Sequence, residues 1–337
     1  MNGFMAEFFQ SYLVGFMILF TVTAGGLLIL LIHLLVGGQW GLASRKPLRA
    51  ITGMFPWVTL LFIPVLLGAH FIYPWTNPEV AADLGRKGVW LTLPFFGLRA
   101  ALFFAFFNAI TFKVRKLITP ETPKHPIEYF QRIGGLSMFS FAVVASLAIF
   151  DWMMSLEPHW SSTLYGVMII MGGGLTAFAL IIITLAWLQN PARPIPISEK
   201  ASHDLGNLMF AFTIFWTYMA VSQYIIMWSG NLPEEIPWYI VRNSGGWHLV
   251  SYLVVIGQFV LPFLLLLAQR RKKNITRLAR VAFFILCMRV VDNFWLIVPD
   301  FSPQQFRLHI LDIVVIGGLI ALWFTLYRRN FAKEVLA

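Results

Sequence analysis

The stretch SYLVGFMILFTVTAGGLLILLIHLLVGG, at residues 11–38, contains no Asp, Glu, Lys or Arg. A helix needs roughly 20 mostly apolar residues to cross the hydrocarbon core of a bilayer. Because lipid offers no hydrogen-bond partners, such a segment must pair its backbone groups internally, as an α-helix does. Similar segments recur along the chain, at 50–73, 88–112, 133–154, 162–189, 205–229, 246–269, 279–298 and 307–327. The sequence therefore predicts an all-α integral membrane protein with about nine transmembrane helices.

The composition agrees with this fold class. Of the 337 residues, 58% are hydrophobic and 12% are charged, and the mean hydropathy is +0.74. Soluble domains are about 45–50% apolar and about 25% charged, so the composition excludes a soluble, disordered or coiled-coil protein. The single cysteine, Cys287, excludes an internal disulfide, a Cys-ligated metal cluster and a covalently attached haem. The seven histidines place no two in one predicted span, which argues against haem b, and we expect no bound metal.

The positive charges predict the orientation. Nineteen of the 25 Lys and Arg residues lie in alternate loops and the C-terminal tail, four lie in the other loops, and two lie inside spans. The positive-inside rule then places the C-terminus in the cytoplasm and the N-terminus outside. The net charge of +10 is thus a feature of topology and does not indicate nucleic-acid binding. The first ten residues lack Lys and Arg, so we do not expect a signal peptide.

Five ionisable residues stand out in the predicted spans: Arg99, Arg289, Asp292, His309 and Asp312. Charges within a membrane are costly and are usually paired. Arg289 and Asp292 have i, i+3 spacing and can pair on one helix face, and His309 and Asp312 repeat that spacing. Two interpretations stay open for both sets: structural pairs that join helices, or a proton path.

Two predicted external loops combine acidic residues with Trp and Pro. They are DWMMSLEPHWSSTLYG at 151–166 and WSGNLPEEIPWY at 228–239. Rigid aromatic loops are typical of contact surfaces rather than of solvated tails. We predict that they dock a partner protein through Glu157, His159, Trp160, Glu234, Glu235 and Trp238.

Three consecutive glycines, Gly172, Gly173 and Gly174, interrupt the fifth predicted span. Small residues let neighbouring membrane helices approach closely. We therefore expect this span to lie against another helix at this point.

Four sequence strings carry a resemblance to a known family. They are the stretch at 151–166, HDLGNLMFAF at 203–212, WTYMAVSQYIIMWSGNLPEEIPWY at 216–239 and GGWH at 245–248. The chain resembles the NrfD-like membrane subunits of bacterial alternative complex III, of the ActF type. The resemblance covers nearly the whole chain and is densest between residues 150 and 300.

The resemblance implies a fold of two four-helix bundles, at 1–154 and 155–300. A flanking transmembrane helix and a cytoplasmic tail would follow at 301–337. Members of the family usually have ten helices with both ends inside, whereas nine are predicted here. The difference leads us to expect that an N-terminal helix is missing from this sequence or has been lost.

The resemblance also implies a function in the bacterial inner membrane. The chain would be a subunit of a quinol:cytochrome c oxidoreductase in a respiratory or photosynthetic electron-transport chain. Its partners would be a paralogous NrfD-like subunit, an extracytoplasmic iron–sulfur protein, multihaem and monohaem cytochromes c, a small membrane subunit and membrane lipid. Haem c and iron–sulfur clusters would lie in those partners, and this chain would bind no redox centre.

The resemblance assigns quinol oxidation to the paralogous subunit, so this chain would not be catalytic alone. It would act as a scaffold for the redox module and could also conduct protons. Menaquinol is a candidate ligand, and a quinol site would need a base near the outer face. The residues in the right position for this base are His70, Asp151, His248 and His309.

Two other classes of protein stay open. A secondary transporter would have broken helices and a central substrate site, and a midplane set of Arg99, Arg289 and Asp292 is compatible with it. A purely structural membrane anchor needs no chemistry.

Overall fold

A computed structural model describes residues 2–118, 127–189, 197–231, 233 and 235–336. These residues form helices and connecting turns, and no strand occurs among them. The predicted all-α fold is therefore confirmed. The long helices are α1 (Asn2–Val36), α2 (Gln39–Thr52), α8 (Leu93–Leu117), α9 (Ile127–Trp152), α10 (Thr163–Leu188), α11 (Glu199–Gly230), α16 (Ile275–Ile297) and α17 (Gly317–Leu336). The shorter α-helices are α3 (Phe55–Leu61), α4 (Ile63–Leu67), α5 (Ala69–Ile72), α6 (Pro78–Asp83), α7 (Arg86–Trp90), α12 (Pro237–Arg242), α13 (Trp247–Val254), α14 (Leu261–Leu267) and α15 (Gln269–Lys272).

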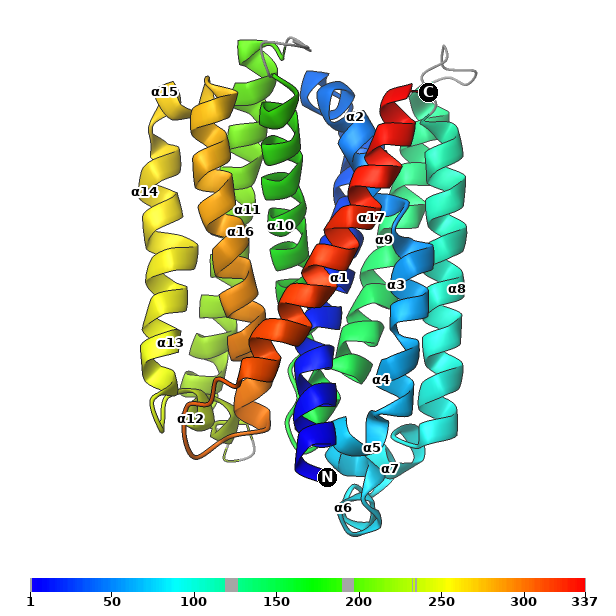
Figure 1. The fold of residues 1–337 in the computed structure, drawn as a ribbon, viewed down its shortest axis with the longest axis vertical. Helices are drawn as coiled ribbons and strands as arrows, with labels where there is room; N and C mark the ends of the chain where they lie inside the picture. The colour runs from blue at the N-terminus through cyan, green and yellow to red at the C-terminus, as the bar shows by residue number, and fades with distance from the viewer. Residues whose placement is uncertain (1, 119–126, 190–196, 232, 234, 337) are drawn as a thin grey trace.

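Eight helical segments in the described residues are long and apolar enough to cross a membrane. They span Gly3–Val36, Gln39–Leu67, Leu93–Leu117, Glu128–Leu156, Thr163–Leu188, Glu199–Gly230, Trp247–Leu267 and Ile275–Asp300. A further helix, formed by the π-helical turn η5 (Asp312–Ile316) and α17, runs obliquely across the front of the other helices and ends at the C-terminus (Figure 1). This arrangement agrees with the prediction of about nine helices in a multi-pass membrane protein.

Several predicted spans have different limits in the structure. The first begins at Asn2 rather than at residue 11, and the second at Gln39 rather than at residue 50. The third begins at Leu93 rather than at residue 88, because Thr92 is extended and Pro94 occupies the first turn of α8, where proline fits best. The ninth begins near Asp312 and continues to Leu336. Its extra turns are held by Glu334, whose carboxylate accepts from Arg49 Nε at 2.5 Å and Arg115 Nη2 at 2.7 Å. This clamp fastens the end of α17 to α2 and α8.

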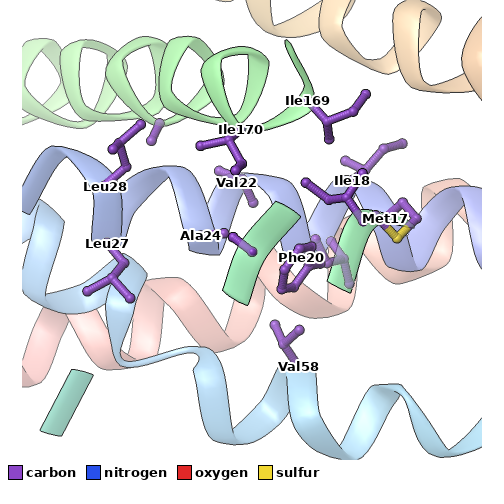
Figure 2. Packing of buried hydrophobic residues seen from close by; sticks show 14 of the residues in the cluster. Met17, Ile18, Phe20, Val22, Ala24, Leu27, Leu28, Val58, Ile169 and Ile170 are labelled. Carbon is purple, nitrogen blue, oxygen red and sulfur yellow. The ribbon is translucent and has the colours of Figure 1, made fainter. Parts of the chain in front are cut away.

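Helices α1 and α10 form the centre of the molecule. In their most apolar 18-residue stretches, 89% and 83% of residues are buried, against 28% in α9, α11 and α13–α14. A helix that is apolar on all sides is suited to burial. Figure 2 shows Ile18 and Val22 of α1 on the side that faces Ile169 and Ile170 of α10, while Phe20 and Ala24 point to the other side, where Val58 of α3 lies.

The three glycines of α10 each lie against a different neighbouring helix. A Cβ on Gly172 would lie 2.2 Å from Arg289 Nη2 of α16, one on Gly173 would lie 2.4 Å from the Thr21 carbonyl oxygen of α1, and one on Gly174 would lie 2.4 Å from the Phe212 ring of α11. Consecutive residues on a helix point about 100° apart, since each turn has 3.6 residues. The predicted close approach is confirmed, and it involves three helices rather than one.

The two ends of the bundle carry different loops. We call the end that holds the N-terminus, α5–α7 and α12 the N-side, and the end that holds α15 and the C-terminus the C-side (Figure 1). The division into bundles at 1–154 and 155–300 stays a prediction. Helices α1 and α10, one from each predicted bundle, pack against each other along their length.

Candidate functional site

A cleft on the N-side brings together several residues predicted to dock a partner. We call it the N-side cleft; its volume is about 570 Å³, and it lies between the α6–α7 loop, the loop after α9 and the start of α12. Its lining residues are Asp83, Leu84, Arg86, Lys87, Glu157, Pro158, His159, Trp160, Pro237 and Trp238. Glu235 instead lines a neighbouring cavity of about 260 Å³ with Gln223 and Met227. Glu234 lies outside the described residues.

Two of the predicted docking residues form the rigid wall of this cleft. The rings of Trp160 and Trp238 stack with centroids 4.8 Å apart and an angle of 12° between their planes. Both are buried, whereas His159 is exposed and Glu157 is partly exposed. Lys87 Nζ donates to the Pro158 carbonyl at 3.0 Å and ties the α7 loop to the same wall. The polar groups accessible to a partner are therefore those at the rim.

Arg242 packs against the buried side of Trp238, beneath the cleft wall. The sequence did not single it out as a site residue. Its guanidinium is fully buried and lies 3.6 Å from the centroid of the Trp238 ring. It donates to Asp300 Oδ1 at 2.9 Å and to the Leu296 carbonyl at 2.7 Å. The i, i+4 spacing of Trp238 and Arg242 was a usable signal for the stacking. The partner Asp300 follows α16 and could not be found from local spacing.

Arg99 pairs with Asp151, so the expected set of Arg99, Arg289 and Asp292 is wrong. Arg99 Nε donates to Asp151 Oδ2 at 2.5 Å. It lies in the second turn of α8, close to the N-side, because the helix begins only at Leu93. The pair is buried against Trp90, whose indole donates to Asp151 Oδ1 at 2.9 Å and whose carbonyl accepts from Arg99 at 2.7 Å.

An apolar cavity of about 240 Å³ adjoins Asp151. It is lined by Lys87, Trp90, Leu91, Leu147, Phe150, Asp151, Met154, Ser155, Pro158, Trp160 and Ser161. Apolar and indole surfaces suit a quinone ring, but both carboxylate oxygens of Asp151 already accept hydrogen bonds. Burial, and secondarily the charge of Asp151, raises the pKa of nearby Tyr73 well above its ordinary value, so this phenol stays protonated. These residues do not fit a quinol-oxidising site with a free base.

The four residues predicted as a quinone-side base do not form one site. His70 is exposed on α5, and His248 is half-buried on α13 with its ring 6.3 Å from that of Tyr252. His309 lies before η5, with Nδ1 3.6 Å from Glu7 Oε2. Within the described chain, no hydrogen bond or ion pair joins any two of these histidines and Asp151.

Asp312 does not hold the imidazole of His309, contrary to the expected pairing. Asp312 Oδ2 accepts from the backbone N–H of His309 at 2.8 Å, and Oδ1 accepts from Ser11 Oγ at 2.6 Å. In a capping box, the side chain at the third helical position reaches back to the backbone N–H of the residue just before the helix, and Asp312 does this for His309. Asp312 is buried.

Arg289 and Asp292 form the predicted i, i+3 ion pair, and this pairing is confirmed. Both side chains are 1% exposed, and Nη1 of Arg289 donates to Oδ2 of Asp292. Three polar atoms in this cluster have no hydrogen-bond partner among the described residues: Arg289 Nη2, Asp292 Oδ1 and Asn293 Oδ1. A cavity of about 80 Å³ borders Arg289 and Asn293 between α1, α10, α16 and α17.

The fold and these clusters define a multi-pass all-α membrane protein with an N-side cleft and a buried ion pair in its centre. No family model matches the chain, and no curated protein matches it. The family resemblance therefore rests on the sequence strings at 151–166, 203–212, 216–239 and 245–248.

Proposed function

We propose that this chain is an integral membrane subunit of a quinol:electron-acceptor oxidoreductase in a bacterial electron-transport chain. In this proposal its N-side is extracytoplasmic and docks the redox module. The observation that carries the proposal is the N-side cleft, because residues from two separate loops with family-like sequence line a single concave surface. The sequence strings supply the class of complex.

The composition of the N-side cleft suits a protein partner. A buried tryptophan stack forms its wall, and Asp83, Arg86, Lys87 and Glu157 provide charges of both signs at its edge. Protein interfaces commonly combine an aromatic core with a polar rim. We propose that the iron–sulfur protein and the cytochromes c dock here, while the paralogous and small membrane subunits pack laterally. Electron transfer belongs to the haem c and iron–sulfur clusters of those partners.

Isolation of the intact complex tests this proposal. The chain, tagged at its C-terminus, would be extracted from its native membrane in a mild detergent and stained for haem after electrophoresis. We expect haem-stained subunits to co-elute with it. Elution of the chain alone, folded and with its lipid, would contradict the proposed assembly.

Replacing Glu157 by Lys should weaken docking without unfolding the chain. The side chain lies at the rim of the N-side cleft, and a reversed rim charge acts mainly on association. We expect association to weaken about tenfold, equivalent to about 1.4 kcal/mol, measured as the haem recovered per tagged chain. Glu79→Lys is the matched control, since Glu79 is exposed on α6 and does not line the cleft. Equal recovery from both variants at ordinary salt would argue against this docking site.

The orientation can be tested separately. If the N-side is external, a reporter inserted after Gly230 should be active only in an extracytoplasmic form. Reporters fused after Ala337 or inserted after Lys273 should both be active only in the cytoplasm, since Lys273 follows α15 on the C-side. The same sidedness for Gly230 and Lys273 would refute the proposed topology.

A second candidate function, solute transport, draws on the central cluster. Arg289 and Asn293, each with a polar atom that has no partner among the described residues, border a cavity in the middle of the bundle. However, that cavity measures about 80 Å³, whereas sites for small organic ligands measure about 300–1,000 Å³. The cavity is too small for an organic solute and is lined mainly by apolar side chains, so it does not favour solute transport.

A further inference from the structure

A basic pocket of about 370 Å³ lies on the C-side, between the end of α14, α15 and the first turns of α16. We call it the arginine pocket. Its lining residues are Leu265, Arg271, Arg277, Arg280, Val281 and Phe284. Arg277 and Arg280 are one helical turn apart on α16, so their side chains lie on the same helix face. The pocket is far from the N-side cleft, at the opposite end of the bundle (Figure 1).

The three arginines have no carboxylate partner within the described residues. Arg271 donates once, to the Leu265 carbonyl at 3.2 Å. Elsewhere on the C-side, Arg49 and Arg115 pair with Glu334, and Lys273 pairs with Glu199 at 2.9 Å. Like charges gathered in one pocket repel each other, and an anion between them removes that repulsion. The arrangement therefore selects for a negatively charged ligand.

The surroundings of the arginine pocket indicate where the anion comes from. Its floor is apolar, formed by Leu265, Val281 and Phe284. Just beyond it, Leu267 is 51% and Phe283 is 61% exposed on the outside of the bundle. In a membrane protein such exposed apolar side chains face the acyl chains. The arginines thus lie at the level where the lipid-facing surface ends, which is the level of the headgroups.

We propose that the arginine pocket binds the phosphate of an anionic phospholipid, whose acyl chains lie along α14 and α16. Arginine presents paired N–H donors that match phosphate oxygens, which gives two-point contacts as well as charge attraction. Basic pockets between transmembrane helices on the cytoplasmic side are suited to lipids of this kind. A free phosphate ion has the same charge and geometry at the headgroup, but it cannot use the apolar floor.

The test compares three probes on the purified, delipidated full chain: phosphatidylglycerol, phosphatidylcholine and inorganic phosphate. Binding is measured by native mass spectrometry and by the shift in Tm. We expect phosphatidylglycerol to bind and to raise Tm, and the other two probes to have little effect. In the Arg277→Gln, Arg280→Gln variant we expect phosphatidylglycerol binding to weaken about tenfold or more, since each basic residue near an anionic surface contributes measurably.

The matched control is Arg328→Gln, Arg329→Gln, which removes the same charge from exposed positions near the C-side end of α17. This control should bind phosphatidylglycerol as the wild type does. If the glutamine variant does not fold, the Arg277→Lys, Arg280→Lys variant takes its place. This variant keeps the charge but lacks the paired N–H donors of arginine, so we expect it to bind phosphatidylglycerol more weakly than the wild type. An equal loss in the control would refute a specific pocket. An equal effect of inorganic phosphate would refute the lipid and leave a free-phosphate site.

Discussion

Replacing Asp292 by Asn should remove most of the folded chain from the membrane. Arg289 would keep its charge in a site where both side chains are 1% exposed, without the carboxylate that now accepts from it. Breaking a buried ion pair by removing one partner typically costs about 3–5 kcal/mol. Total stability is itself only about 5–15 kcal/mol, so the loss is a large share. The measurement is the yield of monodisperse chain after mild extraction, with its Tm.

The companion variant removes both charges. Arg289→Met, Asp292→Leu replaces the pair by apolar side chains of similar size, and such replacements of buried pairs are often neutral or stabilising. We expect it to recover much of the lost yield. Arg99→Gln should not rescue Asp292→Asn, because Arg99 is bound to Asp151 near the N-side.

A different outcome would reveal a proton path through the centre. An amide cannot take up and release a proton at neutral pH as a carboxylate does. If the Asp292→Asn variant assembled in normal amounts but lost proton uptake during turnover, the structural interpretation of the pair would be wrong. The unpartnered atoms beside the central cavity would then mark part of the path.

The second large effect is expected at the crossing of α1 and α10. A Cβ on Gly25 would lie 2.0 Å from the Gly173 carbonyl oxygen, and one on Gly173 would lie 2.4 Å from that of Thr21. Both contacts are with backbone, so the helices must separate to admit a methyl group. Overpacking of this kind costs about 1–3 kcal/mol at each site. We expect Gly25→Ala, Gly173→Ala to lower Tm clearly and to reduce the yield of folded chain.

Gly97→Ala and Gly318→Ala are the matched controls. They make the same substitution within α8 and α17, where a Cβ would meet no atom within 4 Å. Alanine is favoured over glycine in a helix by roughly 0.5–1 kcal/mol, so these variants should be unchanged or slightly more stable. A double variant at Gly25 and Gly173 with the same Tm as these controls would show that α1 and α10 do not need this close approach.

Local sequence strings indicated some site residues and missed others. Trp160 and Trp238 were predicted to belong to docking loops because tryptophan and proline accompany acidic residues there, and they do line one cleft. That the two rings stack on each other was not predictable, since they belong to different loops. Arg242 was missed because its charge looked like one more cation in an external loop, whereas burial beneath Trp238 pairs it with Asp300.

The sequence by itself determined the all-α fold, the approximate positions of the membrane helices and the i, i+3 pair of Arg289 and Asp292. Each of these depends on one segment alone: its apolar length, its internal backbone hydrogen bonds and the spacing along one helix. Only the tertiary structure decided that Arg99 pairs with Asp151, that Glu334 clamps Arg49 and Arg115, and that Asp312 caps a helix. For Arg99 and Glu334, the ion-pair partner depends on which helices become neighbours, and no single segment sets that. For Asp312, the contact with Ser11 of α1 depends on helix packing in the same way.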